Sequence, residues 1–190
     1  MPMGKENVRI LIPQEDLERR VAEMAEEINR DFAKSVSGED GDSLVCIGVL
    51  KGSVFFLVDL LKQLTFPVKV DFFQTASYGS STVAGEVRIR KDVDLPIRGK
   101  DVLLIEDIVD TGHTIRTVLG LLRFRGAKSV RLCALLDKVE RREVDVPIDY
   151  CGFPIEDLFV VGYGLDFDER YRNLPYIGVL ELEPAPPSPS

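Results

Sequence analysis

The spacing of apolar residues changes along the chain, and each change marks an expected element. Apolar residues alternate over 8–12, and a helical repeat follows from Pro13 to Phe32. Short apolar runs then alternate with further helical repeats. We predict strands over 44–50, 68–73, 87–90, 102–105 and 130–136. We also predict a helix over 54–64, and another that begins at the turn after the strand 102–105 and ends at Gly126.

The order of these elements indicates a fold class. Strands that alternate with helices pair in parallel, and the helices cover both faces of the sheet. The sequence therefore predicts an α/β fold with a mostly parallel central sheet flanked by helices. Because ligands of such sheets bind at the carboxyl ends of the strands, the polar residues that follow each strand are the candidates for a functional site.

The strongest candidate follows the apolar run over 102–105. Two acidic residues come next, then Asp-Thr-Gly-His-Thr at 110–114, and then apolar residues at helical spacing. Thr111, Gly112 and Thr114 are small enough for backbone N–H groups to approach an anion. Open N–H groups and the positive end of a helix dipole favour a phosphate. The segment predicts a phosphate-binding turn.

The two acids, Glu106 and Asp107, add a second requirement. At close range they would repel a bound phosphate by roughly 1 to 4 kcal/mol. Sugar hydroxyls and a hard cation relieve this repulsion, because carboxylates accept hydrogen bonds from hydroxyls and ligate Mg²⁺. We infer a phosphorylated ribose carrying Mg²⁺. The alternative is that the acids end a strand while Asp110 and Thr111 cap a helix, although a cap needs only one such residue.

Composition narrows the class of protein. A chain of 190 residues with 45% hydrophobic residues fits one domain with a full core. The net charge of −8 argues against a nucleic-acid-binding protein. We also expect no membrane association and a cytoplasmic location, because no apolar stretch is long enough to span a bilayer and 1–6 lacks a signal-peptide pattern.

The segment over 102–118 resembles the phosphoribosyl pyrophosphate (PRPP) motif of type I phosphoribosyltransferases. Further motifs occur in the order found in hypoxanthine-guanine phosphoribosyltransferases of the bacterial type, and the resemblance extends from about residue 8 to residue 181. These motifs are Leu50-Lys51-Gly52-Ser53, Ser77-Tyr78-Gly79, Asp137-Lys138, and the run from Phe159 to Asp166 followed by Arg172.

The resemblance implies the type I phosphoribosyltransferase fold, with a small hood and a flexible loop. We expect a single domain over 1–183, a hood formed largely by about 150–180 with the N-terminal strand, and a flexible loop that contains Ser77 and Tyr78. The Pro- and Ser-rich residues 184–190 predict a disordered tail.

The resemblance also implies a role for each motif residue. The catalytic residue would be Asp110, which accepts or shares a proton of the purine. PRPP and its 5′-phosphate would be bound by Glu106, Asp107, Asp110, Thr111, Gly112, His113 and Thr114. Pyrophosphate would be bound by Lys51, Gly52 and Arg172, with a cis peptide bond before Lys51. The purine would contact Ile108, Lys138, Phe159, Val160 and Asp166. Mg²⁺ would be held by Glu106, Asp107 and Asp166.

The implied reaction is purine salvage: transfer of the 5-phosphoribosyl group from PRPP to hypoxanthine or guanine, through a cation-like ribosyl state. Lys138 would donate to the purine 6-oxo group, which disfavours adenine because its amino group cannot accept that proton. The family usually forms homodimers or homotetramers. The sequence does not rank hypoxanthine, guanine and xanthine.

Two alternatives remain at this point. One is a regulatory RNA-binding protein that keeps the same fold, which a sequence pI near 4.8 disfavours. The other is a related transferase that acts on adenine, orotate or uracil. Such an enzyme would share the central motif but would not be expected to combine Lys138 with the run from Phe159 to Asp166.

Overall fold

The computed structural model describes residues 6–36, 44–76 and 88–182. The flexible-loop residues Ser77 and Tyr78 and the tail at 184–190 lie outside these ranges, so those two expectations stay predictions. The described elements, in chain order, are β1 (Glu6–Ile12), α1 (Gln14–Val36), β2 (Leu44–Leu50), α2 (Val54–Leu61), β3 (Val68–Ala76), β4 (Arg88–Lys91), β5 (Asp101–Val109), α3 (His113–Phe124), β6 (Ser129–Asp137), the 3₁₀ turn η1 (Val139–Arg141), β7 (Tyr150–Pro154), β8 (Val160–Val161) and β9 (Ile177–Leu182).

The larger sheet has six strands in the order β4-β3-β2-β5-β6-β7. Strands β3, β2, β5, β6 and β7 pair in parallel, and only β4 is antiparallel, at one edge. The predicted α/β class and mostly parallel sheet are confirmed. Because β2 and β5 lie next to each other at the centre, the residues that follow these two strands meet at one end of the sheet.

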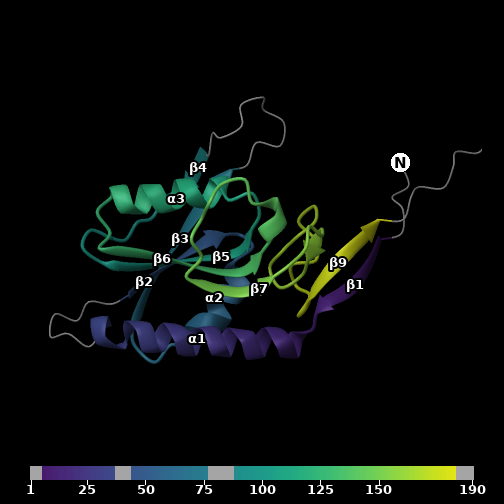
Figure 1. Ribbon diagram of the computed structural model, residues 1–190, viewed down its shortest axis with the longest axis horizontal. Coiled ribbons are helices and arrows are strands. Elements are labelled where there is room, and N and C mark those ends of the chain that lie inside the picture. Colours follow the sequence, from purple (N-terminus) through teal and green to yellow (C-terminus); the bar gives the residue numbers. More distant parts are fainter. Residues whose placement is uncertain (1–5, 37–43, 77–87, 183–190) are drawn as a thin grey trace, which may run out of the picture.

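Helices cover both faces of this sheet, with α1 and α2 on one side and α3 on the other (Figure 1). The strand side chains divide between the two faces with the period of two that a strand imposes. In β2, Leu44 and Cys46 join the core beneath α1 and α2, whereas Val45 and Ile47 join the core beneath α3. The central strands are thus apolar on both faces, which explains their continuous apolar runs.

A second, three-stranded sheet of order β1-β9-β8 lies beside the first (Figure 1). It pairs the N-terminal strand with the C-terminal part of the chain, as expected for the hood. The expected boundary near residue 150 differs, however, because β7 pairs in parallel with β6 and completes the larger sheet. Apart from β1, the strands of the small sheet therefore begin only at Val160.

The elements differ from the sequence expectations mainly at their ends. Strand β5 continues past 105 to Val109, because its pairing with β6 continues through Glu106 and Ile108. The two acids therefore lie within the strand and not in a turn after it. Helix α2 ends at Leu61 and not at residue 64, because the N–H groups of Gln63 and Leu64 bond three residues back and tighten the chain out of the α-helix.

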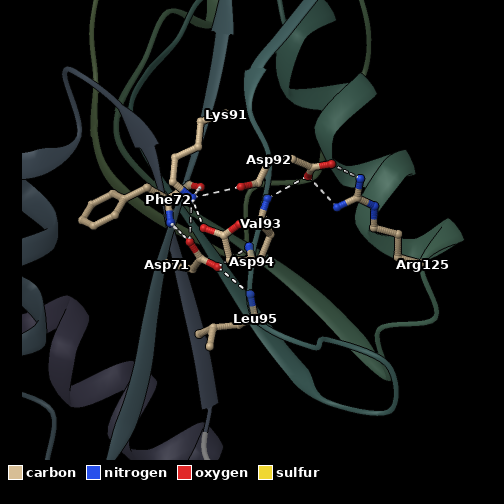
Figure 2. Close-up of polar contacts among 8 residues, drawn as sticks. All are labelled: Asp71, Phe72, Lys91, Asp92, Val93, Asp94, Leu95 and Arg125. Carbon is tan, nitrogen blue, oxygen red and sulfur yellow. Dashed lines mark hydrogen bonds and ion pairs between the residues drawn. The ribbon is translucent and has the colours of Figure 1, made fainter.

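Asp71 fixes the connection between β4 and β5 (Figure 2). Its buried carboxylate accepts hydrogen bonds from the backbone N–H groups of Phe72, Asp94 and Leu95, and Lys91 Nζ lies 3.1 Å from its Oδ1. Burial alone would raise the pKa of Asp71, but the hydrogen bonds from Leu95, Phe72 and Lys91 hold it below its ordinary value of 3.8. One side chain of β3 therefore fixes both the edge strand and the segment leading to β5.

Across the described ranges, no helix has the length and apolar character needed to cross a membrane.

Candidate active site

A cavity of about 290 Å³ opens where β2 and β5 end. The residues around it come from the turn after β2, the end of β5, the start of α3 and the segment between β8 and β9. It is lined by Val49, Leu50, Lys51, Gly52, Thr75, Glu106, Asp107, Ile108, Val109, Asp110, Thr111, Gly112, Thr114, Ile115, Asp166 and Arg172. Most of the residues singled out in the sequence therefore share one cavity.

The turn from β5 into α3 leaves the helix N-terminus open to this cavity. Gly112 is the N-cap residue of α3, with a left-handed φ of 91°, and no side-chain hydrogen bond caps the helix. A Cβ atom at this position would lie 2.9 Å from the carbonyl oxygen of Val144, so glycine is required both by conformation and by space. The alternative in which Asp110 and Thr111 serve as helix caps is wrong, and the first N–H groups of α3 are available to an anion.

Glu106 and Asp107 are adjacent in β5; Glu106 is buried, and Asp107 is half-buried and feels the charge of Arg172. Glu106 is almost fully buried, and its Oε2 accepts no hydrogen bond from the described residues. Burial, with a contribution from the neighbouring Asp107 charge, raises the pKa of Glu106 well above its usual range. Burial also raises the pKa of Asp107 to about 6. Removing a charged carboxylate from water costs free energy unless a partner compensates it. These two acids therefore indicate a ligand that supplies hydroxyl groups or positive charge.

The turn after β2 packs directly against these acids. The peptide bond between Leu50 and Lys51 is cis, as the resemblance implied. A Cβ atom on Gly52 would lie only 1.6 Å from Asp107 Oδ2, so the carboxylate occupies the space that any side chain would need. On its other side, Gly52 contacts Gly164, where an added Cβ atom would lie 2.0 Å from the Gly52 carbonyl oxygen. Three segments thus meet at Gly52.

Arg172 closes the cavity from the segment between β8 and β9. Its guanidinium donates to the Gly164 carbonyl oxygen at 2.7 Å and lies 2.8 Å from Asp166 Oδ1. A third contact at 3.2 Å reaches Glu169, which also pairs with Lys51 at 2.9 Å. Lys51 and Arg172 are 121 positions apart in the sequence. In the fold, the Glu169 carboxylate contacts both of them.

Lys138 and Asp110 flank the adjoining end of β6. Lys138 is buried, its N–H donates to the Val109 carbonyl oxygen, and its Nζ lies 3.2 Å from Asp157 Oδ1. Asp110 Oδ1 lies 3.1 Å from Arg141 Nε, although without the alignment of a hydrogen bond. Arg141 also reaches Asp157 at 3.5 Å. Lys138 and Asp110 are thus linked through Asp157 and Arg141 by a chain of ion pairs.

Lys138 and three other predicted residues do not line the cavity. Phe159 is 54% exposed and packs edge-on against Phe167, with ring centroids 5.6 Å apart. Val160 is buried in β8. His113, the first residue of α3, points its ring to Glu143, with Nε2 2.9 Å from Oε2. Phe159, Val160 and His113 therefore lie outside the wall of the cavity.

Three charged residues of the site region were not predicted: Arg141, Asp157 and Glu169. Each contacts a predicted residue across a loop, so no spacing in the sequence identifies its partner. The only signals are compositional. Arg141 belongs to a basic pair that follows Lys138, and Glu169 belongs to an acidic turn before Arg172.

Comparisons with known proteins agree with this geometry. The family described as phosphoribosyl transferase domain matches residues 10–168. The chain is 45% identical to hypoxanthine phosphoribosyltransferase of Salmonella typhimurium, covering 94% of this chain and 98% of the relative. It is 44% identical to hypoxanthine-guanine phosphoribosyltransferase of Bacillus subtilis, covering 91% and 93%.

Solved structures give the same result. A crystal structure of a hypoxanthine-guanine phosphoribosyltransferase from Bacillus anthracis, with a HEPES molecule in its active site, superimposes with a TM-score of 0.83 at 42% identity, covering 91% of this chain and 99% of that one. A mutant Trypanosoma cruzi hypoxanthine phosphoribosyltransferase in a ternary substrates complex gives 0.85 at 36% identity, covering 95% and 97%. The predicted type I phosphoribosyltransferase fold is confirmed, and the chain belongs to the phosphoribosyl transferase family.

Proposed function

We propose that this protein joins hypoxanthine or guanine to PRPP and releases pyrophosphate, which forms a purine ribonucleoside 5′-monophosphate. The observation that carries the proposal is the single cavity that combines an uncapped helix start, two adjacent carboxylates that are buried or half-buried, and two cations. An anionic sugar phosphate with a second anionic group satisfies all three features at once. The names of the 44–45% identical relatives support the choice of purine.

The 5′-phosphate would occupy the turn at 110–114, where the open N–H groups of α3 and its dipole favour an anion. Glu106 and Asp107 would accept hydrogen bonds from the ribose hydroxyl groups. Lys51, Gly52 and Arg172 would bind the pyrophosphate, for which a guanidinium is well shaped. Each of these groups lines the same cavity.

The acids are also suited to hold Mg²⁺. The buried Oε2 of Glu106 has no hydrogen-bond partner among the described residues, and all three candidates, Glu106, Asp107 and Asp166, offer the oxygen atoms that Mg²⁺ prefers. Within the described ranges, no three metal-binding side chains form a site by themselves. This fits Mg²⁺, which is commonly held by one or two carboxylates together with substrate phosphates. When bound, Mg²⁺ would neutralise charge on the departing pyrophosphate.

In the reaction, the bond from ribose carbon 1 to the pyrophosphate oxygen breaks and a bond to a purine ring nitrogen forms. Lys51 and Arg172 would stabilise the departing anion through charges fixed in advance. Asp110, at the mouth of the phosphate turn, would accept or share the proton of the attacking imidazole ring. Lys138 would donate to the purine 6-oxo group, with Phe159 stacking on the base and the backbone of Val160 and Ile108 beside it.

The test is a steady-state assay with PRPP, Mg²⁺ and each of hypoxanthine, guanine, xanthine, adenine, orotate and uracil. We expect nucleotide from the 6-oxopurines, with adenine disfavoured by at least about tenfold because it leaves the Lys138 donor unpaired. The variant Lys138→Met should reduce this discrimination. Lys128→Met, which changes an exposed lysine at the opposite end of β6, should not. Faster turnover of adenine, orotate or uracil would overturn the assignment.

Two further expectations belong to this proposal. A homodimer or homotetramer is expected from the family, and sedimentation equilibrium of the purified protein tests it. The cytoplasmic location remains a prediction from the sequence.

A further inference from the structure

Glu169 occupies the space between the two cations assigned to pyrophosphate. Lys51 Nζ lies 2.9 Å and 3.0 Å from its two carboxylate oxygens, and Arg172 Nη2 lies 3.2 Å from Oε2. The Glu169 carboxylate thus pairs with both cations at once. Its two oxygens therefore lie where oxygen atoms of a bound anion would have to lie to contact the same two side chains.

The backbone places Glu169 there in an unusual way. Phe167 and Arg170 exchange two backbone hydrogen bonds, which closes a two-residue hairpin turn with Asp168 and Glu169 at its centre. Both central residues have left-handed φ values, 52° and 59°, as a type I′ turn requires. Asn and Gly are the residues that favour such a turn, and glutamate gains nothing from it conformationally. A bulky residue held in this region points to a use for its side chain.

The turn is also tied to the cavity wall. The Glu169 N–H donates to Asp166 Oδ2 at 2.9 Å, and the other oxygen of Asp166 lies 2.8 Å from Arg172. The glutamate side chain is nevertheless 64% exposed, and Lys51 is 53% exposed. The carboxylate can therefore leave the two cations by side-chain rotation into solvent, without disturbing the buried core.

We propose that Glu169 is an internal competitor of pyrophosphate: it holds Lys51 and Arg172 in the empty site and is displaced when the pyrophosphate group of substrate or product binds. The inference rests on the proposed function, which assigns these two cations to pyrophosphate. In this arrangement the glutamate keeps the cations in place between turnovers and returns to them as the product leaves. It weakens pyrophosphate binding and so favours product release.

A purely structural ion pair predicts the opposite result. If Glu169 only held Lys51 and Arg172 in position, its loss would disorder the cations and weaken pyrophosphate binding. If it competes, its loss strengthens binding. Exposed ion pairs contribute little individually, so releasing two of them should change affinity by about two- to tenfold.

The experiment compares Glu169→Gln with Asp168→Asn and the unmodified chain. Asp168→Asn removes the same charge from the neighbouring position of the turn, and among the described residues no ion pair joins Asp168 to Lys51 or Arg172. Pyrophosphate binding in the presence of Mg²⁺ is measured by titration calorimetry. We expect about two- to tenfold tighter binding by Glu169→Gln, a lower KM for PRPP, and an unchanged KM for hypoxanthine. Asp168→Asn should match the unmodified chain.

Each other result overturns the inference. Unchanged or weaker pyrophosphate binding by Glu169→Gln, in a chain that still turns over PRPP and hypoxanthine, removes the competitor role and leaves the proposed function intact. Equal strengthening in both variants shows a general charge effect and also removes it. An absence of pyrophosphate binding in all three proteins, together with no turnover, removes the proposed function and the competitor role with it.

Discussion

Asp110 is the first residue after β5, with Arg141 Nε 3.1 Å from its Oδ1. This ion pair holds the carboxylate at the start of the turn. The residue before it, Val109, accepts a hydrogen bond from the backbone N–H of Lys138. These neighbours suit the proposed role of proton acceptor.

Replacing Asp110 by Asn should lower kcat by about 10² to 10⁴-fold, because the amide has nearly the same shape but cannot accept the proton. The measurement is steady-state turnover of hypoxanthine with saturating PRPP and Mg²⁺. Asp145→Asn, in an exposed acid of the loop before β7, serves as the control and should leave kcat unchanged. Near-normal turnover of Asp110→Asn would remove its assignment as the base.

At this scale, the sequence allowed the motif residues to be predicted but not their ionic partners. The segment at 110–114 and the pair Lys51-Gly52 are local patterns at strand ends, and strand ends of a parallel sheet converge by geometry. The contacts of Glu169 with Lys51, and of Arg141 with Asp110, depend on loop paths and side-chain rotamers. No periodicity encodes those paths, so the structure was needed to find them.

At the scale of elements, Gly52 marks the point where the turn after β2, the strand β5 and the segment before β9 meet. The Asp107 carboxylate occupies the place of a Cβ atom on one side, and Gly164 lies against the Gly52 carbonyl on the other. Neither neighbour can move freely, because Asp107 belongs to a central strand and Gly164 is held by Arg172. The positions of all three segments therefore depend on residue 52 being a glycine, which has no side chain.

We expect Gly52→Ala to lower kcat/KM for PRPP by about 10²-fold, the size of effect that a displacement of about 1 Å produces at a site. The methyl group would force the Asp107 carboxylate away from its place. Gly120→Ala is the matched control, because a Cβ atom on Gly120 of α3 meets nothing within 4 Å. Equal kinetics for the two variants would contradict the close packing at Gly52.

Asp71→Asn tests the anchor between β3 and the segment before β5. We expect a loss of about 1.5 to 3 kcal/mol in the free energy of unfolding, because an amide replaces a charged acceptor and retains only one oxygen. Urea unfolding at neutral pH measures this change. Asp94→Asn, an 86% exposed acid that also pairs with Lys91, should cost much less.

The deficit of Asp71→Asn should also depend on pH. The folded-state pKa of Asp71 lies below its ordinary value of 3.8, so its ionised form stabilises the fold above that pH. The stabilisation is lost as pH falls through the folded-state value. The difference between the two proteins should therefore be constant above about pH 5 and narrow below pH 3.8. A difference that stays constant into this acid range would show that the charge of Asp71 is not its source.

Element types could be predicted more securely than their ends. The alternation of apolar runs and helical repeats predicted each described strand of the larger sheet except β7, whose apolar residues were assigned to the hood. The extension of β5 through Glu106 and Asp107 was missed because acidic residues are rare in central strands, and the backbone pairing with β6 overrides that preference. Tertiary pairing, which no local pattern reports, decided both cases.

At the scale of the whole molecule, the chain has a net charge of −8, although its proposed substrate is an anion. Lys51, Arg172 and the start of α3 supply the groups that can bind an anion in a chain of negative net charge. This arrangement suits a small phosphorylated substrate but not a long polyanion, which needs a continuous basic face.

We therefore expect no retention of RNA in a filter-binding assay, even at about 50 mM salt, where basic modules bind non-specifically. A basic RNA-binding protein of similar size provides the positive control. Retention that falls steeply with added salt would revive the regulatory RNA-binding alternative.

The small sheet has a consequence for how the protein is made. Its first strand, β1, pairs with β9, in a register that joins Glu6 to Leu182. At about 5 to 20 residues per second, roughly 10 to 35 s of translation separate these two strands. The β2, β5 and α3 segments can pack while the chain is still attached to the ribosome, but β1 must wait for its partner. Arg172 and Glu169 precede β9 by only a few residues, so the part of the site that we propose binds pyrophosphate is completed last.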